Sequence, residues 1–174
     1  MTRTKRGGNK AMGKVANLSI GAAIGYASSM AMDKATGWYL GHQSEVSRRR
    51  EEEVAPGGAP VLVGKKLARL VGRDVSDEGA VKIGSVVHRS LGMTYGMAAA
   101  GLTRKGIAPL VAGVATGATA FVVVDEAFLS AFFTPPPWAY PIESHLRGMV
   151  GHLGYGLAAG AMLSVARRLG AVRR

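Results

Sequence analysis

The chain has 174 residues, of which 22 are Lys or Arg, 11 are Asp or Glu and none is Cys. The absence of Cys excludes a disulfide scaffold, a Cys-based zinc site and a thiol nucleophile. The net charge of +11 would suit a nucleic-acid partner, but the basic residues flank long apolar runs, as the positive-inside rule expects. We therefore expect an all-α polytopic membrane protein in a lipid bilayer, with no nucleic acid as a partner.

The first apolar run covers residues 15–32 and follows a basic tail at residues 1–14. The run carries no charge and is long enough, at about 1.5 Å per residue, to cross most of a roughly 30 Å hydrocarbon core. A secretory signal peptide also has a basic start and an apolar run, so a cleaved first segment is the competing interpretation. The length of the run and the lack of a soluble domain after it favour a transmembrane helix.

Residues 33–80 form a charged segment that we expect to lie outside the membrane. Arg48, Arg49 and Arg50 precede three glutamates, so pairs three residues apart are expected on a solvated helix. A short amphipathic helix is predicted to follow, and it either lies on the lipid surface or caps the bundle. Its apolar stripe is expected to contain Val63, Leu67, Leu70 and Val71.

Three further apolar runs complete the predicted membrane region, and none alternates with the period of a β-strand. They are residues 81–102, 107–133 and 148–166, with a proline- and aromatic-rich loop at 134–147 and a basic tail at 167–174. Ser76 is expected to cap the helix of the second run. Basic residues at both termini and in the turn at 103–106 place these parts on the cytoplasmic side. The fold expected is therefore four transmembrane helices with both termini cytoplasmic.

Each apolar run contains two glycines four residues apart. These pairs are Gly21 and Gly25, Gly92 and Gly96, Gly113 and Gly117, and Gly156 and Gly160. Small residues at this spacing let two helix backbones approach closely in lipid, which predicts glycine-rich packing seams. The seams serve either contacts within one chain or a contact with a second copy or another membrane protein.

A faint internal repeat links the second and fourth runs. Residues 92–102 align without gaps to residues 152–162, and Tyr95 and Gly96 match Tyr155 and Gly156. Both runs point the same way in the expected topology, so the repeat would be a parallel one. In a chain this rich in Ala and Gly, chance and common ancestry both explain the match.

Ionisable residues are expected to gather at the outer end of the bundle. The candidate cluster is His88, Arg89, Asp125, Glu126, Glu143 and His152. One interpretation is structural, with Arg89 paired to Asp125 or Glu126, and Glu143 paired to Arg147. A second is a proton-sensitive or ion-conducting site in which His88 and His152 titrate against the carboxylates.

A metal site of histidine and carboxylate ligands is a third interpretation of the cluster, although the sequence has no close pair of histidines. No catalytic motif for an intramembrane enzyme occurs. We therefore expect no catalytic residues, no metal and no cofactor.

Three segments carry a resemblance to a known family. They are MDKATGWY at 32–39, VVHRSLGMTYG at 86–96 and TPPPWAYPIESHLRGMVGHLGYG at 134–156. Together they resemble the YagU-like bacterial inner-membrane proteins, a group of unknown function. The resemblance implies a small multi-pass protein of the bacterial inner membrane. We expect a non-enzymatic role in envelope function or stress tolerance, through helix packing or partner binding. The alternative is a proton- or ion-linked transporter or channel that uses the His and carboxylate cluster.

Overall fold

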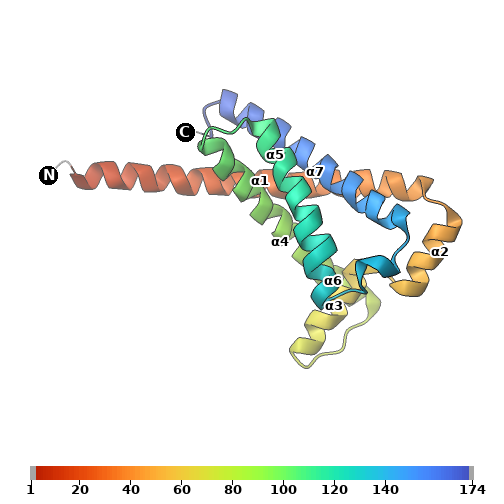
Figure 1. Ribbon diagram of the computed structural model, residues 1–174. Coiled ribbons are helices and arrows are strands. Elements are labelled where there is room, and N and C mark those ends of the chain that lie inside the picture. The colour runs from red at the N-terminus through yellow and green to blue at the C-terminus, as the bar shows by residue number, and fades with distance from the viewer. Residues whose placement is uncertain (1–2, 173–174) are drawn as a thin grey trace.

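The computed structural model describes residues 3–172, with side chains from Val15 onward, and all regular elements in this part of the chain are helices (Figure 1). The all-α class predicted from the sequence is thus confirmed. The helices are α1 (Arg3–His42), α2 (Glu45–Val54), α3 (Gly58–Leu70), α4 (Asp77–Arg104), α5 (Pro109–Ala120), the π-helix η1 (Phe121–Leu129), α6 (Ser130–Phe132), the short 3-10 helix η2 (Pro137–Ala139) and α7 (Ile142–Arg168).

The long helices pack as two antiparallel pairs that also contact each other. α1 packs on α4, and α5 packs on α7, while α1 also lies along α7. α5, η1 and α6 follow one another without a break and act as one long helix. α2 and α3 connect the first pair at one end of the bundle, and the C-terminus lies at the other end, beside the turn between α4 and α5 (Figure 1).

The eight glycines of the predicted seams all face another helix of the same chain. A Cβ atom built on Gly21 would lie 2.8 Å from the carbonyl oxygen of Gly96, and one built on Gly156 would lie 2.8 Å from that of Gly113. Carbonyl groups of a helix backbone cannot move aside as a flexible side chain can. The two helices of each pair can therefore lie this close together because these positions have no side chain.

The interior of the bundle consists mainly of small residues, and the large apolar side chains lie on its surface. Among the described residues, the largest fully buried side chain is that of Leu163, and the remaining interior is mainly Ala, Gly and Ser. Large apolar side chains instead point outward, among them Val122, Val123, Phe128, Phe132 and Leu157. A water-soluble protein would bury these side chains, whereas helices packed in lipid place small residues at their contacts and large ones toward the lipid.

Three helical segments among the described residues are long and apolar enough to cross a membrane, namely Val15–His42, Pro109–Phe132 and Ile142–Arg168. They contain or coincide with the predicted spans at 15–32, 107–133 and 148–166. These helices support a multi-pass membrane protein. The predicted span at 81–102 lies in α4, which is 28 residues long but carries charges in its first half. A fourth crossing therefore stays a prediction.

Several local predictions match the structure. Ser76 caps α4, because its hydroxyl accepts a hydrogen bond from the backbone N–H of Gly79. Gly106 makes the turn before α5 with a φ of 98°, which glycine adopts without strain. Pro109 begins α5, and the prolines after Thr134 end the helix that closes with α6.

Two boundaries differ from the expectation. α1 begins at Arg3, within the predicted tail, and continues through Asp33 to His42. The sequence pattern instead predicted that the helix ends at residue 32. The charged residue does not stop the helix, because the carboxylate of Asp33 finds partners on α4. Residues 1–2 and 173–174 belong to the two predicted basic tails and lie outside the described residues.

The predicted amphipathic helix is present as α3, but only part of its predicted apolar stripe is covered: Val63 is buried and Leu67 is half-buried, whereas the other two members are exposed. Leu70 and Val71 are each 72% exposed, whereas Val61, Val63 and Ala68 are buried. α3 packs against the first half of α4, and Gly64 lies directly against the backbone of Ala80. The close approach at this glycine fixes which face of α3 is covered, and Leu70 and Val71 are left outside.

Candidate functional site

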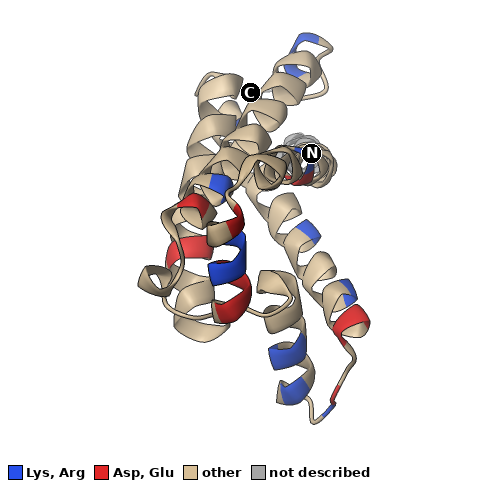
Figure 2. Ribbon diagram, turned by 90° about the vertical axis from the view of Figure 1, so that its right-hand side faces the viewer, with Lys and Arg blue, Asp and Glu red and all other residues tan. Residues whose placement is uncertain are grey.

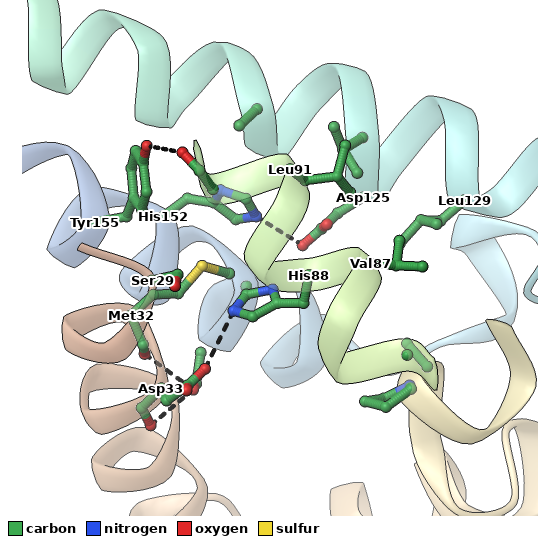
Figure 3. Close-up of a pocket in the computed structure, with 18 of the residues that line it drawn as sticks. Ser29, Met32, Asp33, Val87, His88, Leu91, Asp125, Leu129, His152 and Tyr155 are labelled. Atoms are coloured by element: carbon green, nitrogen blue, oxygen red, sulfur yellow. Dashed lines mark hydrogen bonds and ion pairs between the residues drawn. The ribbon is translucent and has the colours of Figure 1, made fainter. Parts of the chain in front are cut away.

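A cavity of about 380 Å³ lies between the long helices, near the end that α2 and α3 occupy. Helices α1, α3, α4 and α7 and the helix of α5 and η1 all contribute to its wall (Figure 3). Its acidic, basic and histidine residues are Asp33, His88, Arg89, Asp125, Arg147 and His152. We call this the main cavity.

The first polar group on the wall joins α1 to α4. Nε2 of His88 is shielded from solvent and lies 3.2 Å from Oδ1 of Asp33, too poorly aligned for a hydrogen bond. Arg89 donates to the other carboxylate oxygen of Asp33 and, at 2.8 Å, to the hydroxyl of Ser29. The expected pairing of Arg89 with Asp125 or Glu126 is therefore wrong, because the antiparallel crossing brings this part of α4 to α1.

The second polar group joins η1 to α7. Nε2 of His152 lies 3.0 Å from Oδ2 of Asp125, and the His152 side chain is only 9% exposed. The ring of Phe121 covers His152, with ring centres 5.9 Å apart. Figure 3 shows both histidines turned toward the carboxylates of the helix that packs against them. The main cavity thus has one His–Asp pair from each antiparallel helix pair.

The π-helix lets two adjacent carboxylates reach α7. Asp125 contacts His152, and the Oε1 atom of Glu126 lies 2.7 Å from Nδ1 of His145. A π-helix closes its turns with bonds five residues apart, so neighbouring side chains diverge less than on an α-helix, and such segments are frequent at functional sites. The other nitrogen of His145 lies 3.0 Å from the carbonyl oxygen of Pro137.

A second, outer cavity of about 260 Å³ lies beside the main one, and Glu51, Glu126, His145 and Arg147 line it. Glu51 of α2 binds Arg147 through both carboxylate oxygens and also accepts a hydrogen bond from Ser144. Burial raises the pKa of Glu51, but the hydrogen bonds and the charge of Arg147 outweigh it and hold the pKa below its usual range. Glu51 is therefore a stable anion at neutral pH.

The expected pair of Glu143 and Arg147 does not form. Glu143 instead accepts hydrogen bonds from the backbone N–H and the hydroxyl of Ser44, both at 2.8 Å. Glu143 thus binds Ser44, just before α2, and Arg147 binds Glu51 within α2, because this segment folds back over the start of α7. Sequence spacing alone favoured the pair within one helix.

The structure brings together most of the predicted cluster. His88, Arg89, Asp125 and His152 line the main cavity, and Asp125 and Glu126 line the outer one. Glu143 lies on neither wall.

The predicted cluster left out Asp33, Glu51, His145 and Arg147, although His145 and Arg147 were expected nearby, with Glu143 at the outer mouth of the fourth run. One signal could have found Asp33: it follows Gly25 at the same distance at which Asp125 follows Gly117.

Among the described residues, no three His, Asp or Glu side chains are placed to hold a metal ion together. The site consists instead of separate acid–base pairs, and a histidine paired with a carboxylate is suited to take up and release a proton near neutral pH. Comparisons of the sequence with protein-family models, with characterised proteins and with solved structures found no match. Membership of the YagU-like group stays a prediction.

Proposed function

We propose that this chain is an integral membrane protein that conducts protons through the main cavity and whose affinity for a small ion changes as those protons bind. The observation that carries the proposal is the pair of His–Asp contacts on the wall of one cavity, inside a bundle whose outer surface is apolar. Of the roles that the sequence left open, this arrangement favours proton- or ion-linked transport over packing or partner binding alone.

The membrane part of the proposal includes α4 as a fourth span and the glycine crossings as seams within the bilayer. Charged residues in a membrane helix are tolerated when they have partners. In α4, His88 and Arg89 meet Asp33, and Lys82 pairs with Glu78 near the helix start, 2.7 Å away. The Lys82–Glu78 pair is exposed at the helix start, and the deeper His88 and Arg89 have a partner on α1, so these charges are compatible with a membrane-spanning α4.

The orientation follows from the distribution of charge. No Asp or Glu occurs between residues 79 and 124 or after Glu143, so the end formed by the α4–α5 turn and the end of α7 carries only basic residues. Figure 2 shows the opposite end, where α2 carries charges of both signs. The positive-inside rule supports a cytoplasmic location for the basic end, in the inner membrane of a bacterium.

The physical basis of coupling is electrostatic. When an imidazole on the wall takes up a proton, the wall gains one positive charge in surroundings that screen charge poorly. The affinity of the cavity for an ion changes with that charge. Arg89 donates to the same carboxylate that His88 approaches, so Asp33 has a permanently charged partner whether or not His88 carries a proton.

The direct test is proton flux into liposomes that contain the purified protein and a trapped pH-sensitive dye. A membrane potential set with potassium and valinomycin drives the flux. We expect the wild type to acidify the lumen and His88→Ala and Asp125→Asn to fall to the leak rate of empty liposomes. His42→Ala is the matched control, because His42 is exposed and contacts the carbonyl group of Trp38, away from the cavity. Absence of wild-type flux at every pH, or unchanged flux in both cavity variants, would contradict the proposal.

A further inference from the structure

The first helices of the two antiparallel pairs share a sequence pattern. Residues 21–33 and 113–125 both read Gly-x-Ala-x-Gly and then, after seven residues, Asp. The aspartates that end the two patterns, Asp33 and Asp125, are the two carboxylates of the His–Asp pairs. The pattern therefore relates α1 to the helix formed by α5 and η1.

The second helices of the two pairs are related through the contacts that they make. In each pair the first glycine of the pattern meets two positions of the second helix that are four residues apart. Gly21 contacts Gly96 and Ala100 of α4, and Gly113 contacts Gly156 and Gly160 of α7. These contacts are displaced by 60 residues, and the same displacement aligns residues 92–102 with 152–162. Packing and sequence thus give the same register.

The histidines occupy positions one helical turn apart in this register. His152 aligns with Gly92, and His88 aligns with Gly148. A Cβ atom built on Gly148 would lie 3.6 Å from Oδ2 of Asp125. Each aspartate therefore faces the same aligned position on the second helix of its pair. This position holds His88 in the first pair and Gly148 in the second, where the histidine lies one turn further on, at residue 152.

We propose that the chain consists of two copies of one helical hairpin packed in parallel, and that each copy provides one His–Asp site that binds a single proton at the main cavity. The first hairpin is α1 with α4, and the second is the helix of α5 and η1 with α7. The inference deepens the proposed function, because it sets the number of protons at two. In the proton-binding step, the free nitrogen lone pair of the imidazole bonds a proton from hydronium, which is left as water, and nothing is oxidised or reduced.

Two observations place the two sites side by side. Both hairpins line the main cavity, and the hydroxyl of Tyr155 in the second hairpin donates to the carbonyl oxygen of Gly92 in the first, at 2.6 Å. Parallel repeats in transporters are related by an axis along the membrane normal and hold their sites between the repeats. The copies differ at one point: Arg89 supports Asp33, whereas Met149 occupies the aligned position in α7.

The other charged groups on the cavity wall already have partners in other contacts. Arg89 is bound to Asp33, and Arg147 is bound to Glu51 of α2. From α3 the wall receives only apolar side chains, those of Ala59, Pro60 and Val63. The two histidines, each beside its aspartate, are thus the groups on this wall that take up the protons.

The first experiment measures coupling within each pair by double-mutant cycles on the purified protein in detergent, with thermal unfolding as the readout. One cycle uses His88→Gln and Asp33→Asn, and the other uses His152→Gln and Asp125→Asn. We expect a favourable coupling in both cycles that grows as the pH falls from about 8 to about 5, the interval in which histidine gains charge. Cycles that combine a histidine of one hairpin with the aspartate of the other should show no coupling. Coupling in only one pair, or equal coupling in the crossed cycles, would overturn the inference.

The second experiment moves the histidine of the second hairpin to the position used in the first. The variant combines His152→Gly with Gly148→His. The new imidazole at position 148 approaches the ring of Phe121, and removal of the His152 ring leaves space beside that phenyl ring. We expect this variant to regain the pH-dependent coupling to Asp125 that His152→Gly alone lacks. The control combines His152→Gly with Leu153→His, which puts the ring on an outward-facing position. If the variant and the control behave alike, the two hairpins are not equivalent.

These experiments separate the inference from the proposed function, because unfolding requires no flux. Two independent pH-dependent couplings without flux in liposomes would refute transport and leave the two proton sites in place. Flux without the two couplings would support transport and refute the two proton sites. If the variant with the moved histidine does not fold, the cycles on the native pairs still decide whether two sites exist.

Discussion

Gly25 and Gly37 lie on the same helix in opposite surroundings. A Cβ atom on Gly25 would overlap the carbonyl group of Gly92, whereas one on Gly37 would meet no atom within 4 Å. The first glycine therefore sets the distance between α1 and α4, and the second only exposes backbone. This contrast gives a test of close packing at a single residue.

We predict that Gly25→Ala destabilises the protein by about 1–3 kcal/mol, because the two helices must separate to admit the methyl group. Gly37→Ala is the matched control on the same helix, and it should be neutral or stabilising by up to about 1 kcal/mol, since alanine is the better helix former. Unfolding in mixed micelles with increasing SDS measures both. Equal stability of the two variants would show that the crossing tolerates a wider separation.

At the scale of elements, α2 depends on polar contacts for its position. Ser47 is its one buried residue, and Glu51 is the residue that binds α7. Little apolar area holds this helix, so the ion pair of Glu51 with Arg147 decides whether it stays over the outer cavity. α2 is thus the part of the structure that opens most readily.

We predict that Arg147→Ala releases α2, because Glu51 then loses its cation in a half-buried place, at a cost of about 1–3 kcal/mol. A cysteine placed at the buried Ser47 should react faster with a thiol reagent in this variant. Arg50→Ala is the control, since Arg50 pairs with Glu53 on the exposed side.

The pH dependence of the same contact has a definite sign. The folded pKa of Glu51 lies below its ordinary value of 4.5, so the stabilisation is complete above that value and is lost as the pH falls through the folded pKa. Acid should therefore raise the accessibility of the cysteine at position 47 in the wild-type background, measured as its labelling rate relative to a free thiol at the same pH, and change it little in Arg147→Ala. An acid response of equal size in both would show that another group controls α2.

For the whole molecule, the decisive question is whether α4 crosses the bilayer with the three more apolar helices. Its start at Ser76 and its end at Lys105 are both exposed and lie at opposite ends of the helix. The chain has no native Cys, so single cysteines can report each end without further changes.

We predict that an impermeant maleimide labels Ser76→Cys in intact cells and labels Lys105→Cys only after the membrane is permeabilised. The reason is that the basic end of the bundle faces the cytoplasm under the positive-inside rule. Labelling of both positions from one side would mean that α4 lies on the membrane and the four-span topology is wrong.

The sequence by itself determined the local features of this protein. The apolar runs, the Ser76 cap, the glycine turn at Gly106 and the proline stop after Thr134 depend on neighbouring residues, so each could be predicted from its immediate context. The glycine pairs and most of the polar cluster were visible for the same reason. All are properties of a short stretch of chain.

Only the tertiary structure decided which polar side chains meet. Arg89 binds Asp33 of α1, and Arg147 binds Glu51 of α2, although nearer candidates in the sequence had the right charge. Partner choice depends on how each helix is rotated and where two helices cross, and here both are fixed by the contact of glycine backbones far apart in the chain. A charge pattern contains neither the rotation nor the crossing, so the two-sided site emerged only when the hairpins were packed together.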